Sequence, residues 1–211
     1  YKYIASSGTT HSGIFSEVPT GMDFEDKDNY IYWSGAVLYG STDVTLPSTV
    51  WTADIDAAHI HKTTGGHSIT VVAGNEIYYS IDGSPFVQDV SIDLGTFTDA
   101  YWNGSEGVLL GTLGIYETSN HGANWSQSTS DVSDIAKITK LDGKVIANTT
   151  DGEWKQLVSG VFEDWYAIGG YRLNDLGINN NHLVAVGENQ TILNYNTTTQ
   201  ELEWVDRDAL N

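Results

Sequence analysis

At residues 108–111 the chain reads Val108-Leu109-Leu110-Gly111, a short apolar run that ends in a small residue. The final residues of this run and of five similar ones along the chain are 33, 34, 37, 37 and 39 residues apart. A spacing of this size is typical of repeat proteins, in which each repeat is one supersecondary unit. The other five runs are Tyr3-Ile4-Ala5-Ser6-Ser7, Val37-Leu38-Tyr39-Gly40, Val71-Val72-Ala73-Gly74, Val145-Ile146-Ala147-Asn148 and Val184-Ala185-Val186-Gly187.

Each run predicts a β-strand that is covered on both faces. The runs are rich in Val, Ile and Tyr and are bounded by Gly, Asn and Asp, as strands are. Their continuous apolar character indicates burial on both sides. Further strands can be traced around them, and no segment has the period or the capping residues of a helix. The predicted strands are 67–74, 76–80 and 86–92 in the third copy; 98–103, 107–111, 114–118 and 125–128 in the fourth; and 173–178, 183–187, 191–195 and 201–206 in the sixth.

Successive four-stranded meanders of about 35 to 45 residues predict an all-β fold, a β-propeller of four-stranded antiparallel blades. Six blades are favoured and five are the alternative, because about 42 residues per blade is equally ordinary. Residues 1–211 are expected to form a single β-propeller domain. The chain does not begin with Met, which predicts that the domain is part of a larger chain. The first repeat lacks an innermost strand, which either residues 206–211 or flanking sequence would supply.

The turn after one predicted third strand carries a more specific signal. It reads Thr118-Ser119-Asn120-His121-Gly122-Ala123-Asn124-Trp125. This resembles the Asp-box (BNR) repeat, Ser/Thr-x-Asp-x-Gly-x-x-Trp, of sialidase-like and photosystem-assembly-factor-like propellers, with Asn in place of the Asp. Shortened copies stand at 80–86 and 149–154, and a diverged copy at 195–204. Asp or Asn bonds the backbone of its own turn, Gly tolerates a positive φ, and the aromatic ring fills the turn. The box is therefore expected to be structural.

Composition limits the partners. Against 28 Asp and Glu residues there are nine Lys and Arg residues, and the formal net charge is −19. Neutralising phosphate needs clustered Lys and Arg, so no nucleic acid partner is expected. No run is long and apolar enough for membrane insertion. Without Cys there are no disulfides or thiolate metal sites. Abundant Thr, Ser, Asn, Gly, Tyr and Trp with scarce Lys favours an extracellular or virion-surface location.

Polar residues in the loops are the candidate ligand-binding groups. In Asp-box propellers the loops that join strands two and three open on the rim opposite the boxes. We place 8–12, 41–47, 75–76, 112–113, 149–152 and 188–190 on that rim. A convergent set of hydrogen-bonding groups there would suit sugar hydroxyls, although any exposed loop is polar. The set consists of His11, Asp43, Asn75, Glu76, Glu188, Asn189 and Gln190.

Two tryptophans extend this candidate site. The sequence Tyr32-Trp33-Ser34-Gly35 matches Tyr101-Trp102-Asn103-Gly104, which places Trp33 and Trp102 at equivalent ends of two predicted inner strands. They either pack in the core or stack on a sugar ring beside the central opening.

Two further groups could hold a metal. His59 and His61 would lie on one face of a strand and could bind zinc, or they could be a packed histidine pair. The segment Asp23-Phe24-Glu25-Asp26-Lys27-Asp28 could hold calcium, but it lacks the glycine and spacing of an EF-hand. Solvated charge is the plainer explanation of that segment. No cofactor is expected, with calcium as the possible exception, and the metal ligands are unknown.

Catalytic signatures are weak. Sialidase-like enzymes clamp the substrate carboxylate with three arginines and use a tyrosine nucleophile, whereas this chain contains only Arg172 and Arg207. Other glycosidases need two positioned carboxylates, and among 28 acids a pair chosen by sequence carries no information. Nucleophile elbows, phosphate loops and dinucleotide fingerprints are missing. The sequence therefore leans against an enzyme.

The leading interpretation is a non-enzymatic recognition module that binds a cell-surface glycan or protein receptor. Its general resemblance is to receptor-binding propellers of bacteriophage tails or other secreted adhesive proteins, with neighbouring virion or cell-surface subunits as further partners. The alternatives are a secreted polysaccharide-degrading enzyme and a structural or assembly propeller that holds another protein.

Overall fold

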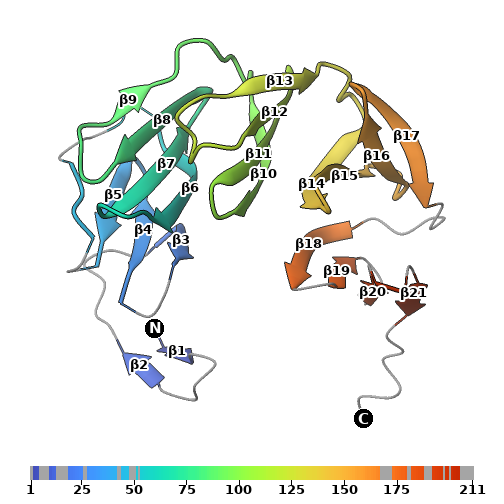
Figure 1. The fold of residues 1–211 in the computed structure, drawn as a ribbon, viewed down its shortest axis with the longest axis horizontal. Helices are drawn as coiled ribbons and strands as arrows, with labels where there is room; N and C mark the ends of the chain where they lie inside the picture. Colours follow the sequence, from blue (N-terminus) through green and yellow to red (C-terminus); the bar gives the residue numbers. More distant parts are fainter. Residues whose placement is uncertain are drawn as a thin grey trace. The chain divides into compact units, whose positions relative to one another are not determined.

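The computed structural model describes residues 2–4, 10–12, 19–25, 28–41, 44–47, 51, 53–166, 173–179, 182–187, 192–196, 198–199 and 201–204 (Figure 1). Within these residues every regular element is a β-strand, and the strands form six antiparallel sheets. No helix in this part of the chain could span a membrane.

The sheets follow one another along the sequence. The first pairs β1 (Lys2–Ile4) with β2 (Thr10–Ser12), and the second contains β3 (Gly21–Phe24), β4 (Tyr30–Ser34) and β5 (Val37–Gly40). The other four sheets have four strands each. They contain β6 (Ile55–Lys62), β7 (His67–Ala73), β8 (Glu76–Ile81) and β9 (Val87–Gln88); β10 (Phe97–Asn103), β11 (Glu106–Gly111), β12 (Gly114–Thr118) and β13 (Ser126–Thr129); β14 (Ile135–Leu141), β15 (Lys144–Thr149), β16 (Trp154–Val158) and β17 (Val161–Tyr166); and β18 (Leu173–Asn179), β19 (His182–Gly187), β20 (Ile192–Asn196) and β21 (Glu201–Trp204).

The chain divides into two compact units, which are described separately. The first unit is Tyr1–Asp93 together with Gly104–Glu106 and Ser119–Trp125, two turns of the β10–β13 sheet. The second unit is Leu94–Asn103, Gly107–Thr118 and Ser126–Asn211. In each unit the first strands of successive sheets contact each other, β3 with β6 in the first, and β10 with β14 and β14 with β18 in the second.

Second strands form the most buried part of each sheet. Six of the seven residues of β7, and five of the six in both β11 and β15, are buried. A strand that has a neighbour on both sides and a sheet packed on each face leaves no side chain in water, which explains the continuous apolar runs.

The buried side chains form apolar cores between sheets. In the first unit one core joins Ile31 and Trp33 of β4 to Ile60, Ile69 and Val71 of β6 and β7. The second unit has two such clusters. One contains Val108, Leu110, Ile138 and Val145, and the other contains Ile146, Trp154, Leu183 and Tyr195.

Several sequence predictions are confirmed. The fold is all-β with four-stranded antiparallel sheets, and β12 begins and ends where predicted. Strands 98–103, 173–178 and 191–195 are each shifted or extended by one residue. The predicted strand 86–92 is shorter, since β9 is only Val87–Gln88. The blade count stays a prediction, and residues 206–211 lie outside the described part of the chain.

One register prediction is wrong. The repeat pattern predicts that Val37–Gly40 is the second strand of its sheet, like Val71–Gly74 and Val108–Gly111. In the structure this run is β5, the third strand of the order β3-β4-β5. The second strand is β4, whose three central residues Ile31, Tyr32 and Trp33 are buried. The true first strand, β3, was missed because Gly21-Met22-Asp23-Phe24 alternates half-buried and exposed residues and forms no apolar run. Trp33 therefore lies on a second strand and Trp102 on the first strand β10, so their positions are not equivalent.

Residues 149–154 were expected both as a shortened box and, at 149–152, as a loop that joins strands two and three, and the structure agrees with the loop. It connects β15 to β16, the second and third strands of their sheet, whereas the box turn follows a third strand. The amide of Thr149 donates to the carbonyl of Glu153, and the amide of Gly152 donates to the carbonyl of Thr149. This turn has the residue types of an Asp-box, but it joins the second and third strands of its sheet and not the third and fourth.

Candidate functional site

The predicted rim residues are only partly described. Asp43, Glu188, Asn189 and Gln190 lie outside the described residues, and His11 is described only as a backbone position in β2. Residues 41 and 44–47, the described part of the loop that contains Asp43, follow the third strand β5. Asn75 is exposed in the β7–β8 turn, as expected for that rim.

Glu76 is engaged by its own sheet. One carboxylate oxygen accepts a hydrogen bond from the Tyr78 hydroxyl at 2.6 Å, and the other accepts from Nε2 of Gln88 at 2.9 Å. Burial, the hydrogen bond to Glu76 and the charge of Glu76 together raise the pKa of Tyr78 to about 12. These contacts tie β8 to β9, so Glu76 has a structural role whatever else it binds.

The two candidate tryptophans lie over glycines of neighbouring strands. A Cβ on Gly21 would overlap the indole of Trp33, its cross-strand partner, and a Cβ on Gly107 would overlap the indole of Trp102. Trp33 is 8% exposed and belongs to the core, while Trp102 is half-buried. The geometry of Trp33 favours packing over sugar stacking.

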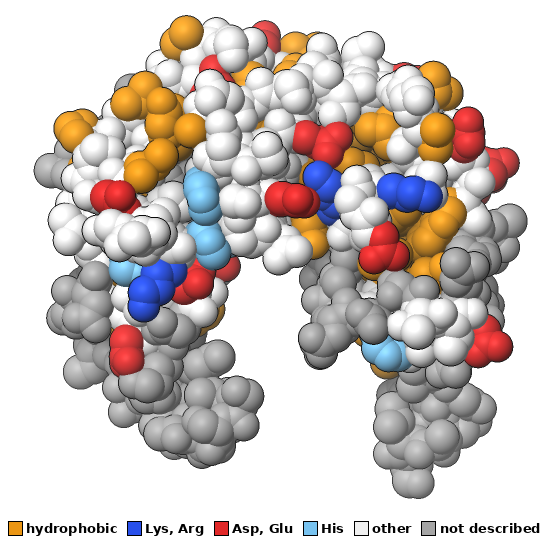
Figure 2. Space-filling model, viewed as in Figure 1, with side chains coloured by type: hydrophobic (Ala, Val, Ile, Leu, Met, Phe, Trp, Pro, Cys, Tyr) orange, Lys and Arg blue, Asp and Glu red, His pale blue; other side chains and the backbone are white. Residues whose placement is uncertain are grey.

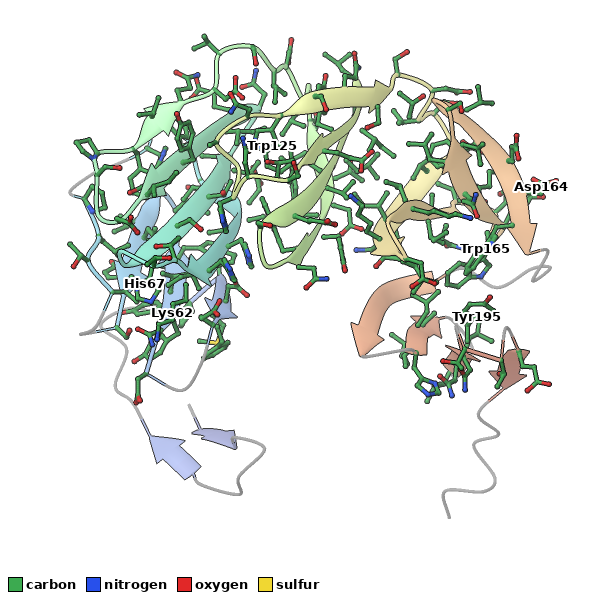
Figure 3. All side chains as sticks on the ribbon, viewed as in Figure 1. Lys62, His67, Trp125, Asp164, Trp165 and Tyr195 are labelled. Carbon is green, nitrogen blue, oxygen red and sulfur yellow. The ribbon has the colours of Figure 1, made fainter. Side chains whose placement is uncertain are left out.

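The box turn has the contacts that its residue types predict. The amide of Asn124 donates to Oδ1 of Asn120 at 3.0 Å, and Nε1 of the buried Trp125 donates to the carbonyl of Gly122 at 3.1 Å (Figure 3). His121 and Gly122 have φ values of 61° and 80°. Thr70 of β7 donates from Oγ1 to the carbonyl of His121, which anchors the turn within the first unit.

A cluster of histidines and carboxylates lies beside this turn. His59 and His61 share one face of β6, as predicted, with the buried Ile60 on the other. Nδ1 of His59 lies 2.8 Å from Oδ2 of Asp23, and Nδ1 of His61 lies 3.2 Å from Oε2 of Glu25. Histidine side chains gather over β6 in Figure 2.

The described members of this cluster are paired with one another. Two carboxylates of the segment 23–28, the calcium candidate, are paired with these histidines: Asp23 with His59 and Glu25 with His61. Asp26 and Lys27 lie outside the described residues. Among the described residues, no three or more His, Asp or Glu side chains are arranged to hold a metal ion.

Two aspartates join the first strands of successive sheets in the same way. Oδ2 of Asp23 on β3 accepts a hydrogen bond from the amide of Ile60 on β6, and Oδ2 of Asp99 on β10 accepts one from the amide of Ile138 on β14, each at 2.9 Å. A basic side chain precedes each isoleucine, and Lys137 lies 3.4 Å from Asp99. Burial raises the pKa of Asp99, although the Ile138 amide and Lys137 oppose the increase.

A small pocket lies between the β14–β17 and β18–β21 sheets, entirely within the second unit. Its volume is about 120 Å³, and its apolar wall consists of Leu141, Ile146, Trp165 and Tyr195. Figure 3 shows Trp165 of β17 and Tyr195 of β20 next to each other, with ring centroids 5.0 Å apart and planes at 72°. Trp165 also contacts Trp154, with centroids 6.0 Å apart.

Polar side chains complete the pocket. Asp142 and Lys144 flank the tight β14–β15 turn, in which Asp142 and Gly143 have φ values of 50° and 77°, and both side chains are exposed. Gln156 comes from β16 and is half-buried. Sequence reasoning missed this pocket, because its residues come from different strands. The Asp-Gly pair of the turn was its only local signal.

The structure resembles known propellers. It is similar to the β-propeller domain of Swd1 from Myceliophteria thermophila, with a TM-score of 0.60 and 11% identity over 94% of this chain and 76% of that chain. It is also similar to YCF48 bound to D1 peptide (TM-score 0.60, 14% identity, 87% of this chain and 67% of that chain). A third similar structure is PorZ, a bacterial surface component of the type-IX secretion system of Porphyromonas gingivalis (TM-score 0.67, 10% identity, 85% of this chain).

These similarities show the fold alone. The chain has a β-propeller fold with four-stranded antiparallel blades, as predicted. No protein-family model and no curated protein matches the sequence. The chain spans only 27% of the PorZ chain.

Proposed function

We propose that this chain is a non-enzymatic recognition module that binds a cell-surface glycan or receptor through the pocket between the β14–β17 and β18–β21 sheets. The observation that carries the proposal is the wall of Trp165 and Tyr195 beside Asp142, Lys144 and Gln156. Small-ligand sites are concave and combine aromatic side chains with a few convergent polar groups. The aromatic rings can pack against an apolar face of a ligand, and the polar side chains can donate and accept hydrogen bonds to its polar groups.

Two of the similar structures support a binding role. YCF48 is bound to a peptide, and PorZ is a bacterial surface component. The acidic, lysine-poor composition supports an extracellular or virion-surface location, such as a bacteriophage tail or a secreted adhesive protein.

The experiment is binding of the purified chain to an array of bacterial and host glycans, with calcium and again with chelator. Selective binding supports the proposal, and loss of binding on chelation would assign metal sites to the acidic segments. Release of reducing ends from any polysaccharide would overturn the non-enzymatic part of the proposal.

A protein partner is the second candidate, favoured by the peptide-bound YCF48 structure. It predicts a stable complex with a neighbouring subunit and no affinity for glycans. The rim set of His11, Asn75, Glu76 and Glu188 is the alternative surface. If that rim carries binding, replacing His11, Glu76 and Glu188 together abolishes cell binding, whereas changes at Trp165 leave cell binding intact.

A further inference from the structure

We infer that the pocket is a subsite for a single neutral sugar ring, an inference that rests on the proposed recognition function and names the ligand class of the same site. The volume of about 120 Å³ sets the size of the ligand. At about 30 Å³ per molecule in the liquid, this space corresponds to roughly four waters. A drug-sized ligand needs a pocket of about 300 Å³ or more. This space admits one edge of a sugar ring, and the rest of the ring and any further residues of a glycan extend into solvent.

The wall of the pocket matches the apolar face of such a ring. Tyr195 is 7% exposed and Ile146 is 1% exposed, so these two lining side chains are fixed by packing, while Trp165 is half-buried. Trp165 contacts the rings of both Tyr195 and Trp154. An indole held in this way offers a preorganised surface for the C–H groups of a pyranose, with little rotamer entropy left to lose.

The polar groups match hydroxyls and not a net charge. Asp142 supplies acceptors, Lys144 supplies donors, and the amide of Gln156 supplies both. Asp142 and Lys144 carry opposite charges two residues apart, so the described lining of the pocket has no net charge to select a cation or an anion. Each hydroxyl of a sugar both donates and accepts hydrogen bonds, so the hydroxyls of one ring can pair with all three side chains.

The charge of the whole chain disfavours anionic sugars. A net charge of −19 repels sialic and uronic acids at long range, and among the described residues Lys144 is the only basic side chain that lines the pocket. Neutral hexoses and N-acetylhexosamines meet no such barrier. A hydrophobic or basic side chain of a protein partner could enter the same space, but it would leave most of the polar groups without partners.

The test is titration of the full chain with the methyl glycosides of glucose, galactose, mannose and N-acetylglucosamine, and with methyl glucuronide and methyl sialoside. Binding is followed by saturation-transfer NMR. We expect at least one neutral glycoside to bind with Kd on the order of 1 mM. W165A should weaken this binding about tenfold or more, and D142N and Q156A by about threefold to tenfold. W165F keeps an aromatic wall and should retain most of the affinity. D164N, at an exposed residue of β17 that does not line the pocket, is the matched control for D142N and should leave the affinity unchanged.

Each other outcome has a defined meaning. Glycan binding that is unchanged in W165A and D142N overturns the subsite while leaving the recognition function in place. Preference for methyl glucuronide or methyl sialoside overturns neutral selectivity. Capture of a protein partner that is lost in W165A, without sugar binding, assigns the pocket to a side chain of that partner. A blank glycan array together with absent cell binding removes the proposed function itself. Thermal unfolding of each variant near the wild-type temperature is required for every comparison.

Discussion

The imidazole rings of His61 and His121 are stacked, with centroids 5.1 Å apart and planes at 15°. His61 belongs to β6, and His121 belongs to the box turn. Nδ1 of His121 is buried and has no hydrogen-bond partner among the described residues. Burial is the main cause that lowers the pKa of His121, and the nearby His61 and His59 lower it further. The stack therefore favours the neutral form of His121, so the stability of the box turn should depend on pH.

Acidification should weaken the first unit through His121. The pKa of His121 is 6.5 in the unfolded chain and lower in the folded chain, so the unfolded state binds the proton first. The stability that His121 contributes is present above pH 6.5 and is lost as the pH falls through the folded pKa. In urea unfolding between pH 5 and 8, H121N should lose less stability on acidification than the wild type. Asn also tolerates the positive φ at this position.

A histidine in the other unit provides the control for this prediction. His182 is half-buried, with Nδ1 2.9 Å from Oδ1 of Asn194. The variant H182N should keep the pH dependence that H121N loses. An identical pH slope in H121N and the wild type would contradict the role assigned to the stack.

Asp99 should produce the opposite pH dependence. Burial raises its folded pKa above the ordinary value of 3.8, so the folded state holds the proton more tightly than the unfolded state. The stability that Asp99 contributes is present in full below about pH 3.8 and is lost as the pH rises through the folded pKa. D99N should remove this loss, because an amide oxygen can still accept from Ile138. Calorimetry of wild type and D99N across pH 3.5 to 7 measures the difference, and D164N, at a side chain 88% exposed, should change nothing.

Glu76 should control the ionisation of Tyr78. Replacing the carboxylate in E76Q removes the charge and weakens the acceptor that helps to raise the pKa of Tyr78 to about 12. The pKa of Tyr78 should then fall from about 12 toward the ordinary tyrosine value of 10.0, and absorbance at 295 nm records this as one tyrosine that ionises at lower pH. In a Y78F background the substitution E76Q should leave the titration unchanged. An unaltered titration of E76Q in the wild-type background would show that burial alone sets this pKa.

The sequence contains strong signals for strands that are buried on both faces. Val71–Ala73 and Val108–Gly111 were found because sheet packing on two sides demands an unbroken apolar run. β3 was not predicted, because Met22 and Phe24 are exposed and the strand contains no apolar run. As a result, β5 was assigned as the second strand of its sheet although it is the third. Whether a strand is the first, second or third of its blade depends on tertiary packing, and a repeated apolar run does not show it.

The candidate site was less accessible from the sequence. Trp165 and Tyr195 belong to different sheets and meet only because those sheets pack together. The loop residues Glu76 and Asn75 carry the composition of a binding rim, but composition does not reveal that Glu76 is bonded to Tyr78 and Gln88. The box turn could be interpreted well, since the contacts of Asn120, Gly122 and Trp125 are local.

Two glycines with similar backbones should separate conformational cost from steric cost. Gly122 has a φ of 80° and Gly143 a φ of 77°, so alanine at either position pays the same penalty of about 1 kcal/mol for a positive φ. A Cβ at Gly143 has open space, whereas a Cβ at Gly122 would overlap Oγ1 of Thr70, which holds the turn through its hydrogen bond to His121. G122A should therefore lose about 2 to 3 kcal/mol of unfolding free energy in urea, and G143A only about 1 kcal/mol. Equal losses would mean that the box turn can move away from β7, and that its contact with Thr70 does not anchor it.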